Sequence, residues 1–451
     1  MKIIIVGCGR VGQNLAETLN EDGNEVTVVD MNASKVHEIS GRLDVMGVVG
    51  NGATPGTLRE AGIKGADIFI AVTNSDELNL LCCMIAKKES ECHTIARVKN
   101  PEYSTETAYL KEELGLAMVI NPEYEAAEEI SRILRFPAAL KIEPFAKGEV
   151  ELIKFRLPTN SPIVGISIKE AMIKYRFNVL VSTIERGEEA YIANGDFVFQ
   201  EKDVVSIVAT PKNAYDFFDT IKCKGHSIKH VLVVGGGVIT HYLCEILEKS
   251  GLSLKIIEKD GKICEELAAQ FPKFSIIHGN PADKELLTEE GISRAGAFVA
   301  LSDLDEENIL LSLFAKDVTD NKMITKINRT DYDSVINRLD LDTTVCPINI
   351  TSDEILRYAR SIKSTSGCNI ETLYNIIPGQ VEAAEFIIGE NSPITGKPLS
   401  QLKFKPNVLV ASIYRDKQAL IPRGNDEIKA GDSVVIISKE LGLTDVADVL
   451  R

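Results

Sequence analysis

The sequence is an internal duplication, and this constrains the fold more than any other feature. Residues 2–30 read KIIIVGCGRVGQNLAETLNEDGNEVTVVD, and residues 230–258 repeat them as HVLVVGGGVITHYLCEILEKSGLSLKIIE. Gly7 corresponds to Gly235 and Asp30 to Glu258, an offset of 228 in both pairs. Residues 50–74 are similar to 279–303 at an offset of 229, and residues 160–171 are similar to 391–402. Such self-similarity marks a structural unit used twice.

Each copy begins with short apolar runs that alternate with helical patterns. This alternation predicts a doubly wound parallel sheet, a Rossmann-type α/β domain whose ligands sit at the carboxyl ends of the strands. A further helix from Pro122 to about Arg135 has Glu near its start and Arg at its end, and Pro137 follows it, which are ordinary helix boundary signals. The strands expected in the first copy are Lys2–Val6, Glu25–Val29, Val45–Val49, Ile68–Val72 and Thr94–Val98.

The second part of each copy is different in composition. Residues 143–222 and 371–451 contain short alternating runs between turn residues, with little helix expected except around Ile168–Lys174. We interpret each as a small α+β lobe. The predicted order is a first Rossmann domain at 1–136, a first small lobe at 137–226, a second Rossmann domain at 227–366 and a second small lobe at 367–451.

A glycine motif opens the first copy. Gly7, Gly9 and Gly12 fit GxGxxG after a predicted strand and before a predicted helix, and Asp30 follows at the end of the next strand. In this context the pattern is a dinucleotide fingerprint. The first glycine permits the tight turn, the second lets the backbone approach a pyrophosphate, and the third lets the helix pack against the sheet. The phosphates then meet free N–H groups at the helix N-terminus.

Asp30 is expected to accept hydrogen bonds from the adenosine ribose hydroxyls and to repel a 2′-phosphate, which favours NAD over NADP. The alternative is a structural turn with Asp30 ending a strand. Arg97 is expected either to balance a phosphate or to pair with a structural carboxylate. The candidate cofactor-binding residues of the first copy are Gly7, Cys8, Gly9, Arg10, Val11, Gly12, Asp30, Asn51, Gly52, Thr73, Asn74 and Arg97.

The second copy departs from the fingerprint. Thr240 stands where the third glycine belongs, so the helix and strand are expected to lie further apart. Glu258 provides a carboxylate for the ribose hydroxyls at the position of Asp30, but Lys259 follows it and Lys326 replaces Arg97. A nucleotide site is the preferred interpretation, with a purely structural domain as the alternative. Its candidate residues are Gly235, Gly236, Gly237, Val238, Ile239, Glu258, Asn280, Ser302, Asp303 and Lys326.

Composition excludes several classes of function. With 66 acidic against 50 basic residues the net charge is −16, which repels nucleic acid and anionic lipid. No apolar run approaches the roughly 20 residues that span a bilayer, and MKIIIVGCGR lacks a cleavage-site pattern. The nine cysteines show no CxxC spacing and are expected to be reduced and buried. We therefore expect a cytoplasmic protein that does not bind nucleic acid and reaches a membrane only through a protein partner.

The sequence offers no candidate catalyst. A dehydrogenase needs an acid or base near its substrate, yet residues 143–222 and 371–451 contain neither His nor Cys. We expect no enzyme activity and no metal site. An NAD-dependent oxidoreductase with a Ser or Lys catalyst, and a divalent-cation site among the lobe carboxylates, remain the alternatives. The six histidines have no spacing typical of a metal site or triad; they are His37, His93, His226, His230, His241 and His278.

With these motifs, the chain resembles the bacterial and archaeal TrkA proteins, regulatory subunits of Trk potassium uptake. The resemblance covers essentially the whole chain as two tandem pairs of RCK N-terminal and C-terminal domains. It implies a cytoplasmic ring of four chains under a membrane potassium-conducting subunit, with NAD, NADH, ATP or ADP controlling ion flow. It also implies crossover helices at Pro122–Arg135 and Thr351–Ser361. A nucleotide-sensing subunit of a different channel or exporter is the alternative.

Overall fold

The computed structural model describes the chain except for residues 105–106, 188, 224–227, 329–335, 337, 340, 364–368, 378, 391, 417, 440 and 444. The described residues form two compact units, each of which combines part of both copies. Unit 1 contains Met1–Ser131 and Lys229–Ser352, and unit 2 contains Arg132–Ile228 and Asp353–Arg451. The predicted domain boundaries near 226 and 366, and His226, lie outside the described residues.

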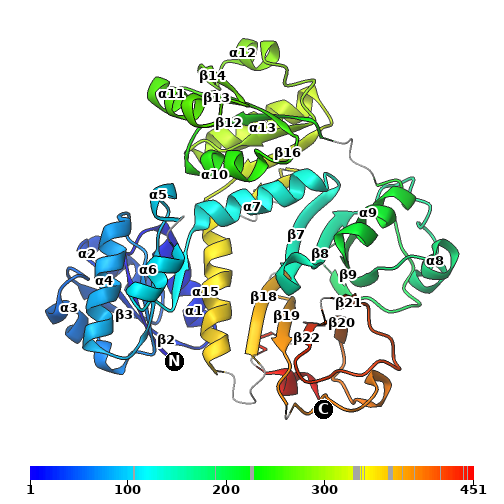
Figure 1. Cartoon of the computed structure of the whole chain (residues 1–451), viewed down its shortest axis with the longest axis horizontal. Helices are drawn as coiled ribbons and strands as arrows, with labels where there is room; N and C mark the ends of the chain where they lie inside the picture. Colours follow the sequence, from blue (N-terminus) through cyan, green and yellow to red (C-terminus); the bar gives the residue numbers. More distant parts are fainter. Residues whose placement is uncertain are drawn as a thin grey trace. The chain divides into compact units, whose positions relative to one another are not determined.

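The first copy opens with a six-stranded parallel sheet of order β3-β2-β1-β4-β5-β6, flanked by helices (Figure 1). This strand order reverses between β1 and β4, the switch point at which doubly wound sheets bind ligands. The strands are β1 Lys2–Val6, β2 Glu25–Asp30, β3 Met46–Val49, β4 Ile68–Ala71, β5 His93–Arg97 and β6 Met118–Ile120. The helices are α1 Arg10–Glu21, α2 Ala33–Arg42, α3 Pro55–Glu60, η1 Ile63–Gly65, α4 Asp76–Glu89, α5 Pro101–Ser104, α6 Thr107–Glu113 and α7 Pro122–Arg135.

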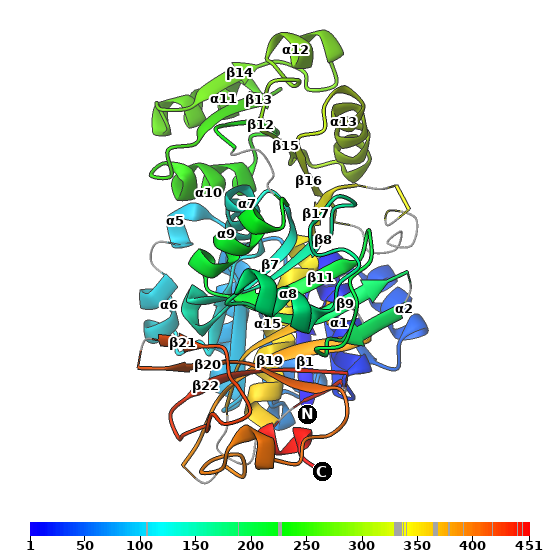
Figure 2. The same cartoon turned by 90° about the vertical axis from the view of Figure 1, so that its right-hand side faces the viewer.

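The second copy repeats this sheet with the order β14-β13-β12-β15-β16-β17. Figure 2 shows α10 and α11 on one side of it and α13 on the other. The strands are β12 His230–Val234, β13 Ser253–Glu258, β14 Ser275–His278, β15 Ala297–Ala300, β16 Lys322–Lys326 and β17 Thr343–Val345. The helices are α10 Val238–Leu247, α11 Gly261–Gln270, α12 Lys284–Glu289, α13 Asp305–Val318 and α15 Pro347–Lys363. The predicted pair of Rossmann-type parallel sheets is confirmed.

Each small lobe is a five-stranded sheet, with orders β10-β9-β11-β8-β7 and β18-β19-β22-β20-β21, in which the paired strands run antiparallel. This confirms the α+β lobes. The first has β7 Ala139–Phe145, η2 Ala146–Gly148, β8 Val150–Arg156, α8 Ile168–Tyr175, β9 Leu180–Arg186, β10 Glu189–Ile192, β11 Val204–Ala209 and α9 Pro211–Thr220. The second has β18 Asn369–Ile377, β19 Val381–Ile387, η3 Leu399–Gln401, β20 Val408–Arg415, β21 Gln418–Leu420, β22 Ser433–Ser438 and η4 Val446–Val449.

Two helix predictions were wrong in part. The first lobe contains α9, which the prediction of little helix outside Ile168–Lys174 omitted. Thr210 caps it by accepting a hydrogen bond from the Asn213 N–H at 3.3 Å, and Pro211 occupies the first turn. The crossover helix expected at Thr351–Ser361 is longer, because α15 begins at Pro347. By contrast, α7 has the predicted bounds Pro122–Arg135.

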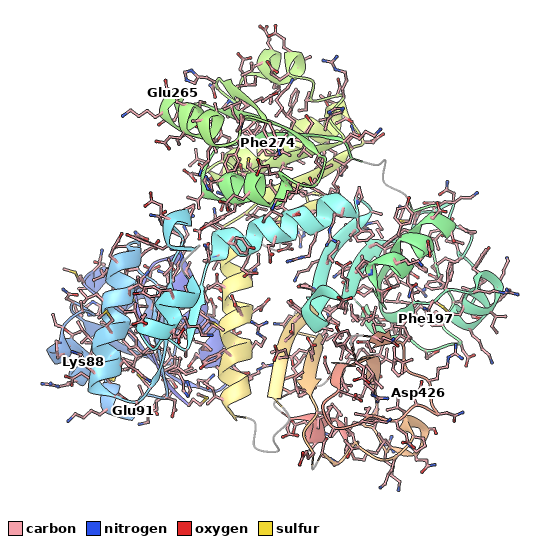
Figure 3. The ribbon with its side chains drawn as sticks, viewed as in Figure 1. Lys88, Glu91, Phe197, Glu265, Phe274 and Asp426 are labelled. Carbon is pink, nitrogen blue, oxygen red and sulfur yellow. The ribbon has the colours of Figure 1, made fainter. Side chains whose placement is uncertain are left out.

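The two lobes preserve the same ion pair at equivalent positions. Arg186 at the end of β9 donates from Nε and one terminal nitrogen to Asp203, both at 2.8 Å, and Arg415 on β20 does the same to Asp432 at 2.7 and 2.6 Å. The Arg186 guanidinium also lies 4.8 Å from the centre of the Phe197 ring, which is labelled in Figure 3. Bidentate pairs of this kind fix the geometry of both partners, so they stabilise the turns that precede β11 and β22.

A half-buried carboxyl group makes the stability of unit 2 pH-dependent. Burial raises the pKa of Asp353 from 3.8 to about 6, and Glu143 raises it further while Lys141 lowers it. The folded chain therefore keeps the Asp353 proton up to about pH 6, whereas the unfolded chain releases it near pH 4. The contribution of Asp353 to stability is highest below pH 4 and is lost as pH rises from 4 to 6, by about 2–3 kcal/mol.

Asp353→Asn should therefore raise the melting temperature at pH 7.5 and leave it nearly unchanged at pH 4, because the amide removes the cost of ionisation while Asn375 still has an oxygen to contact. The two melting curves are to be compared by differential scanning calorimetry. Asp196→Asn, at an exposed carboxylate of the first lobe, is the matched control. Equal shifts for both variants at pH 7.5 would contradict the assignment.

Within the described ranges, none of the helices combines the length and the apolar composition that a bilayer span needs.

Candidate functional site

The glycine turn between β1 and α1 has little room for side chains. Gly7 has φ of +107°, and a Cβ there would lie 2.9 Å from the carbonyl carbon and oxygen of Val72 at the end of β4. A Cβ at Gly12 would lie 1.8 Å from the Gly7 carbonyl oxygen. A Cβ at Gly9 would meet nothing within 4 Å, so this glycine leaves open space above the turn. The geometry fits the three roles that the fingerprint assigns.

The N-terminus of α1 points its backbone N–H groups at this open space. Gly9 is the N-cap residue, and no side chain among the described residues caps the helix. The neighbouring helix α2 differs, since Asn32 accepts hydrogen bonds from the Ser34 and Lys35 N–H groups at 3.0 and 3.4 Å. The uncapped first turn of α1, with residues Arg10, Val11 and Gly12, is therefore available to an anion.

Asp30 organises the glycine turn. One carboxylate oxygen accepts a hydrogen bond from the Cys8 N–H at 2.7 Å, and the other accepts one from the Asn32 N–H at 2.8 Å. The carboxylate is half-buried, and each oxygen has a further lone pair for a ribose hydroxyl. The Cys8 side chain is buried, and its burial raises the pKa of the thiol to about 12. Cys8 thus contributes backbone geometry, and its thiol stays protonated.

The remaining candidates of the first copy lie in the loops after β3 and β4 and, for Arg97, at the end of β5. Asn51 closes its own loop by accepting a hydrogen bond from the Ala53 N–H at 2.9 Å. A Cβ at Gly52 would lie 2.3 Å from Val6 Cγ1, so only glycine fits beside β1. The Thr73 N–H and hydroxyl both donate to the Asn79 side-chain oxygen at 2.7 Å. These contacts shape the rim of the site.

Asn79 is a structural residue of the site that sequence reasoning missed. It is fully buried, and its amide nitrogen donates to the Arg97 carbonyl at 2.9 Å, joining the ends of β4 and β5. In the second copy, Asn308 accepts from the Ser302 N–H at 2.8 Å and donates to the Lys326 carbonyl at 3.1 Å. The recurrence of Asn at the offset of 229 is the signal that could have found this pair.

The second glycine turn reproduces the first with modifications. Gly235 has φ of +97°, and Glu258 accepts hydrogen bonds from the Gly236 N–H at 2.6 Å and the Asp260 N–H at 2.8 Å. The Thr240 hydroxyl donates to the Gly235 carbonyl at 2.6 Å. A side chain therefore occupies a place where, in the first copy, not even a Cβ fits, which requires wider spacing of turn and helix. Gly237 is the N-cap residue of α10, and no side chain among the described residues makes a capping hydrogen bond to this helix.

The structure brings both glycine turns to one cavity of about 480 Å³ within unit 1. Gly9, Arg10 and Val11 line it from the first copy, and Gly237, Val238 and Ile239 line it from the second. Five cationic and two anionic side chains also line it. The cationic residues are Arg10, Lys35, Arg97, Lys99 and Lys326, and the anionic residues are Glu123 and Asp303.

This concentration of positive charge is unexpected in a chain of net charge −16. Its residues come from separate strands and helices of both copies, so no basic run marks it in the sequence. The charged side chains labelled Lys88 and Glu91 in Figure 3 are, by contrast, exposed at the amino-terminal edge of the first sheet. The charge of this cavity and the two uncapped helix N-termini are suited to an anion.

Arg97 contacts a carboxylate in the cavity. One of its terminal nitrogens lies 2.5 Å from Glu123 Oε1, and the two side chains are 13% and 18% exposed. In the described part of the chain, Arg97 Nε and Glu123 Oε2 are buried without a hydrogen-bond partner. Of the two expectations for Arg97, pairing with a carboxylate is thus observed, and a donor remains for a ligand.

Lys326 is the counterpart of Arg97 in the second copy. Burial lowers its pKa, while Asp303, Asp305 and Glu123 oppose that shift. Its ammonium group lies 3.8 Å from Asp303 and donates to the Leu301 carbonyl at 3.4 Å. Glu123 of the first copy therefore interacts electrostatically with cations of both copies.

Twelve of the candidates are not among the residues that line this cavity, and Asn280 closes its own loop by accepting from the Ala282 N–H at 3.1 Å. They are Gly7, Cys8, Gly12, Asp30, Asn51, Gly52 and Thr73 of the first copy and Gly235, Gly236, Glu258, Asn280 and Ser302 of the second. Asn74 and Asp303 line it at equivalent positions, as an amide in the first copy and a carboxylate in the second.

The helices that begin at the glycine turns also join the two copies in unit 1. Tyr242 on α10 is fully buried, donates to the Lys99 carbonyl at 3.0 Å and accepts from the Asn121 amide at 2.8 Å. At the equivalent position of α1, Asn14 accepts a hydrogen bond at 2.5 Å from the hydroxyl of Ser352 on α15. A ligand at either glycine turn would therefore touch a helix that contacts the other copy.

The described residues contain no group of three or more His, Cys, Asp or Glu placed to hold a metal ion. Burial also raises the pKa of Cys82 and Cys244 to about 12. These thiols stay protonated at neutral pH and are poor nucleophiles.

The fold and cavity define a duplicated protein with two halves, each a Rossmann-type domain followed by an antiparallel lobe. Residues 3–122 and 231–347 match the TrkA-N domain, and residues 152–222 and 383–450 match the TrkA-C domain. The chain belongs to the TrkA family.

Relatives match it over their full length. The chain is 32% identical to the Trk system potassium uptake protein TrkA homolog 1 of Methanosarcina mazei, covering 99% of both chains. It is 30% identical to the corresponding homolog of Archaeoglobus fulgidus, covering 100% of both. Among solved structures, the GsuK RCK domain has a TM-score of 0.64 at 16% identity, covering 98% of this chain and 93% of that one. The GsuK likeness shows the fold.

Proposed function

We propose that this chain is a nucleotide-binding regulatory subunit that controls potassium uptake by a membrane partner of the Trk type. The observation that carries the proposal is the cationic cavity onto which both uncapped glycine-turn helices open. Its relatives carry the name of a potassium uptake system. The partner is a potassium-conducting Trk subunit in the cell membrane, and the chain lies at its cytoplasmic face in a ring of four copies. It does no chemistry on its ligand.

NAD or NADH is the ligand we propose for the first copy, with ATP or ADP as the alternative. The pyrophosphate lies at the N-terminus of α1, and Asp30 accepts the ribose hydroxyls. The loop residues after β3 and β4 and Arg97 at the end of β5 complete this site, and the corresponding residues of the second copy complete the cavity. We also propose that the chain divides into four domains, which end at residues 136, 226, 366 and 451. A GsuK channel structure bound to NAD has the same fold, with a TM-score of 0.64.

The regulatory step is a shift between two conformations. A ligand shifts such an equilibrium only by its difference in affinity for the two states. Here α1 contacts α15 through Asn14 and Ser352, and α10 contacts Asn121 through Tyr242. A nucleotide that prefers one arrangement of these contacts favours that arrangement. The coupling per effector is typically about 1–3 kcal/mol, and identical sites in a ring add their contributions.

A thermal-shift panel tests the binding half of the proposal. NAD, NADH, NADP, ATP and ADP are compared at equal concentration, because a ligand at 100 times its Kd stabilises the native state by about 2.7 kcal/mol. We expect NAD or NADH to raise the melting temperature by several degrees and NADP to do so less. Asp30→Asn should remove the response, while Asp44→Asn, at a carboxylate before β3, should not.

Potassium uptake by membranes that contain the copurified partner tests the regulatory half. Uptake should change with nucleotide for the wild-type chain and not for Asp30→Asn. Nucleotide binding that leaves uptake unchanged would refute regulation. Sustained change of NADH absorbance with a candidate substrate would instead favour an oxidoreductase, and copurification with a different channel or exporter would reassign the partner.

A further inference from the structure

The cavity reaches the two copies unequally. The adenosine end of a copy is defined here as the carboxyl ends of its second and third strands and the helix between them. In the first copy, Lys35 on α2 lines the cavity at this end. The residue at the offset of 228 is Ile263 on α11, which is not among the lining residues. Lys35 is thus the one residue of the first adenosine end that lines the cavity among the described residues, and the second adenosine end contributes none; Asp30 and Glu258 are outside the lining in both copies.

Ile263 packs on the second glycine turn, in the space next to Gly236, whose counterpart in the first copy is the buried Cys8. A Cβ at Gly236 would lie 2.9 Å from Ile263 Cγ2 and 3.0 Å from Glu258 Cγ, so both side chains pack directly on the glycine turn. Glu258 is only 7% exposed, and both of its carboxylate oxygens accept backbone N–H groups. Asp30 makes the same two kinds of hydrogen bond but stays half-buried. A ribose can therefore approach Asp30 and not Glu258.

His278, which is itself exposed, lies on the other side of the same end. Its Nε2 lies 3.1 Å from the Lys259 carbonyl oxygen, and a Cβ at Gly261 would lie 3.5 Å from its Cε1. The imidazole therefore bridges the ends of β13 and β14. In the first copy the equivalent residue is Val49, which is 47% exposed, and Met31 nearby is 72% exposed. Exposed apolar side chains beside Asp30, the carboxylate proposed to bind the ribose, can pack against the flat face of a purine ring.

We propose that the chain binds one adenosine-containing nucleotide, in the first copy, because Ile263 and His278 close the adenosine end of the second. The second copy contributes its glycine turn and Lys326 to the shared cavity and no adenosine site. This inference rests on the proposed function, since it concerns the same nucleotide. It also assigns Ile263 and His278 as the residues that make the duplicated domains differ in specificity.

Isothermal titration calorimetry of the full-length chain with NAD tests the number of sites. We expect one NAD per chain. Asp30→Asn should abolish binding, whereas Glu258→Gln should leave the stoichiometry at one NAD per chain. Two NAD per chain, with one lost in Glu258→Gln, would overturn the inference and leave the proposed function intact. No NAD binding to the wild-type chain would overturn the proposed function and this inference with it.

A transplant of first-copy residues tests the closure itself. The double variant Ile263→Lys and His278→Val carries the residues found at positions 35 and 49. It should bind a second NAD, detected as a rise in stoichiometry from one to two. Val49→His in the first copy is the converse variant and should weaken the single site about tenfold or more. Circular dichroism establishes that each variant is folded. A folded double variant that still binds one NAD would overturn the assignment of closure to these residues.

Discussion

Gly12→Val is expected to abolish nucleotide binding and to lower the stability of unit 1 by about 3 kcal/mol. A Cβ at this position would lie 1.8 Å from the Gly7 carbonyl oxygen, a backbone atom that cannot move without moving the whole turn. The helix α1 must therefore move away from the turn, and its first N–H groups move with it. Thermal melting with and without NAD measures both effects.

Gly9→Ala is the control that separates packing from binding. Gly9 has φ of −74°, which any residue adopts, and a Cβ there meets nothing within 4 Å. This variant should melt close to the wild-type temperature but bind NAD less tightly, because the methyl group occupies space intended for the pyrophosphate. A Gly12→Val chain with wild-type melting and wild-type NAD response would show that the turn does not position the ligand.

The second copy shows how the chain accommodates a side chain at the equivalent position. Thr240 is fully buried and satisfies its hydroxyl on the Gly235 carbonyl. The wider spacing of turn and helix predicted from the lost glycine follows from this contact. What the sequence could not predict is the hydrogen bond that makes the substitution stable, since it depends on the final position of α10.

The fold was predictable where local signals and the repeat agree. Pro122 in the first helical turn, acidic residues after it and Arg135 at the end gave the bounds of α7. The Thr210-Pro211 pair carries an equally good start signal for α9, but the surrounding alternating pattern was interpreted as strand and turn. The start of α15 at Pro347 was missed although Pro122 is its counterpart in the first copy.

The cavity was not predictable in the same way. The sequence identified the two glycine turns and the strand-end residues of each copy separately. Their meeting depends on how the two copies pack in unit 1, through long-range contacts such as the one between Asn14 and Ser352. Glu123, which links the cations of both copies, was interpreted only as an acidic residue at a helix start. Only the tertiary packing shows that Glu123, besides being an acidic residue at the start of a helix, lines the cavity.

Glu123→Gln and Arg97→Met are expected to change nucleotide affinity in opposite directions. Glu123 contacts Arg97 at 2.5 Å and opposes the lowering of the Lys326 pKa, so its carboxylate competes with a bound phosphate for both cations. Glu123→Gln keeps the shape and removes the charge. NAD affinity should then rise about tenfold, while the stability of the unliganded chain falls by about 3 kcal/mol because the buried Arg97 loses its counter-ion and Lys326 keeps only Asp303 and Asp305.

Arg97→Met removes a cation and leaves the carboxylate, so NAD affinity should fall about tenfold or more. Its stability should also fall, because Glu123 is then a buried charge with Lys326 as its remaining counter-ion. The double variant should recover most of the stability lost in either single variant, since removing both members of a buried pair costs less than removing one. The difference between double and single variants isolates the coupling of the two side chains.

The opposite changes in NAD affinity expected for Glu123→Gln and Arg97→Met distinguish an anion site from a structural ion pair. If Arg97 and Glu123 only stabilise the fold, both single variants lower the melting temperature and neither raises the affinity for NAD. If the cavity holds phosphate, stability and affinity separate: both single variants melt earlier without ligand, but only Glu123→Gln gains a larger shift with NAD. Calorimetric titration together with melting of the three variants measures both quantities. Parallel losses of affinity in both single variants would rule out the cavity as the phosphate site.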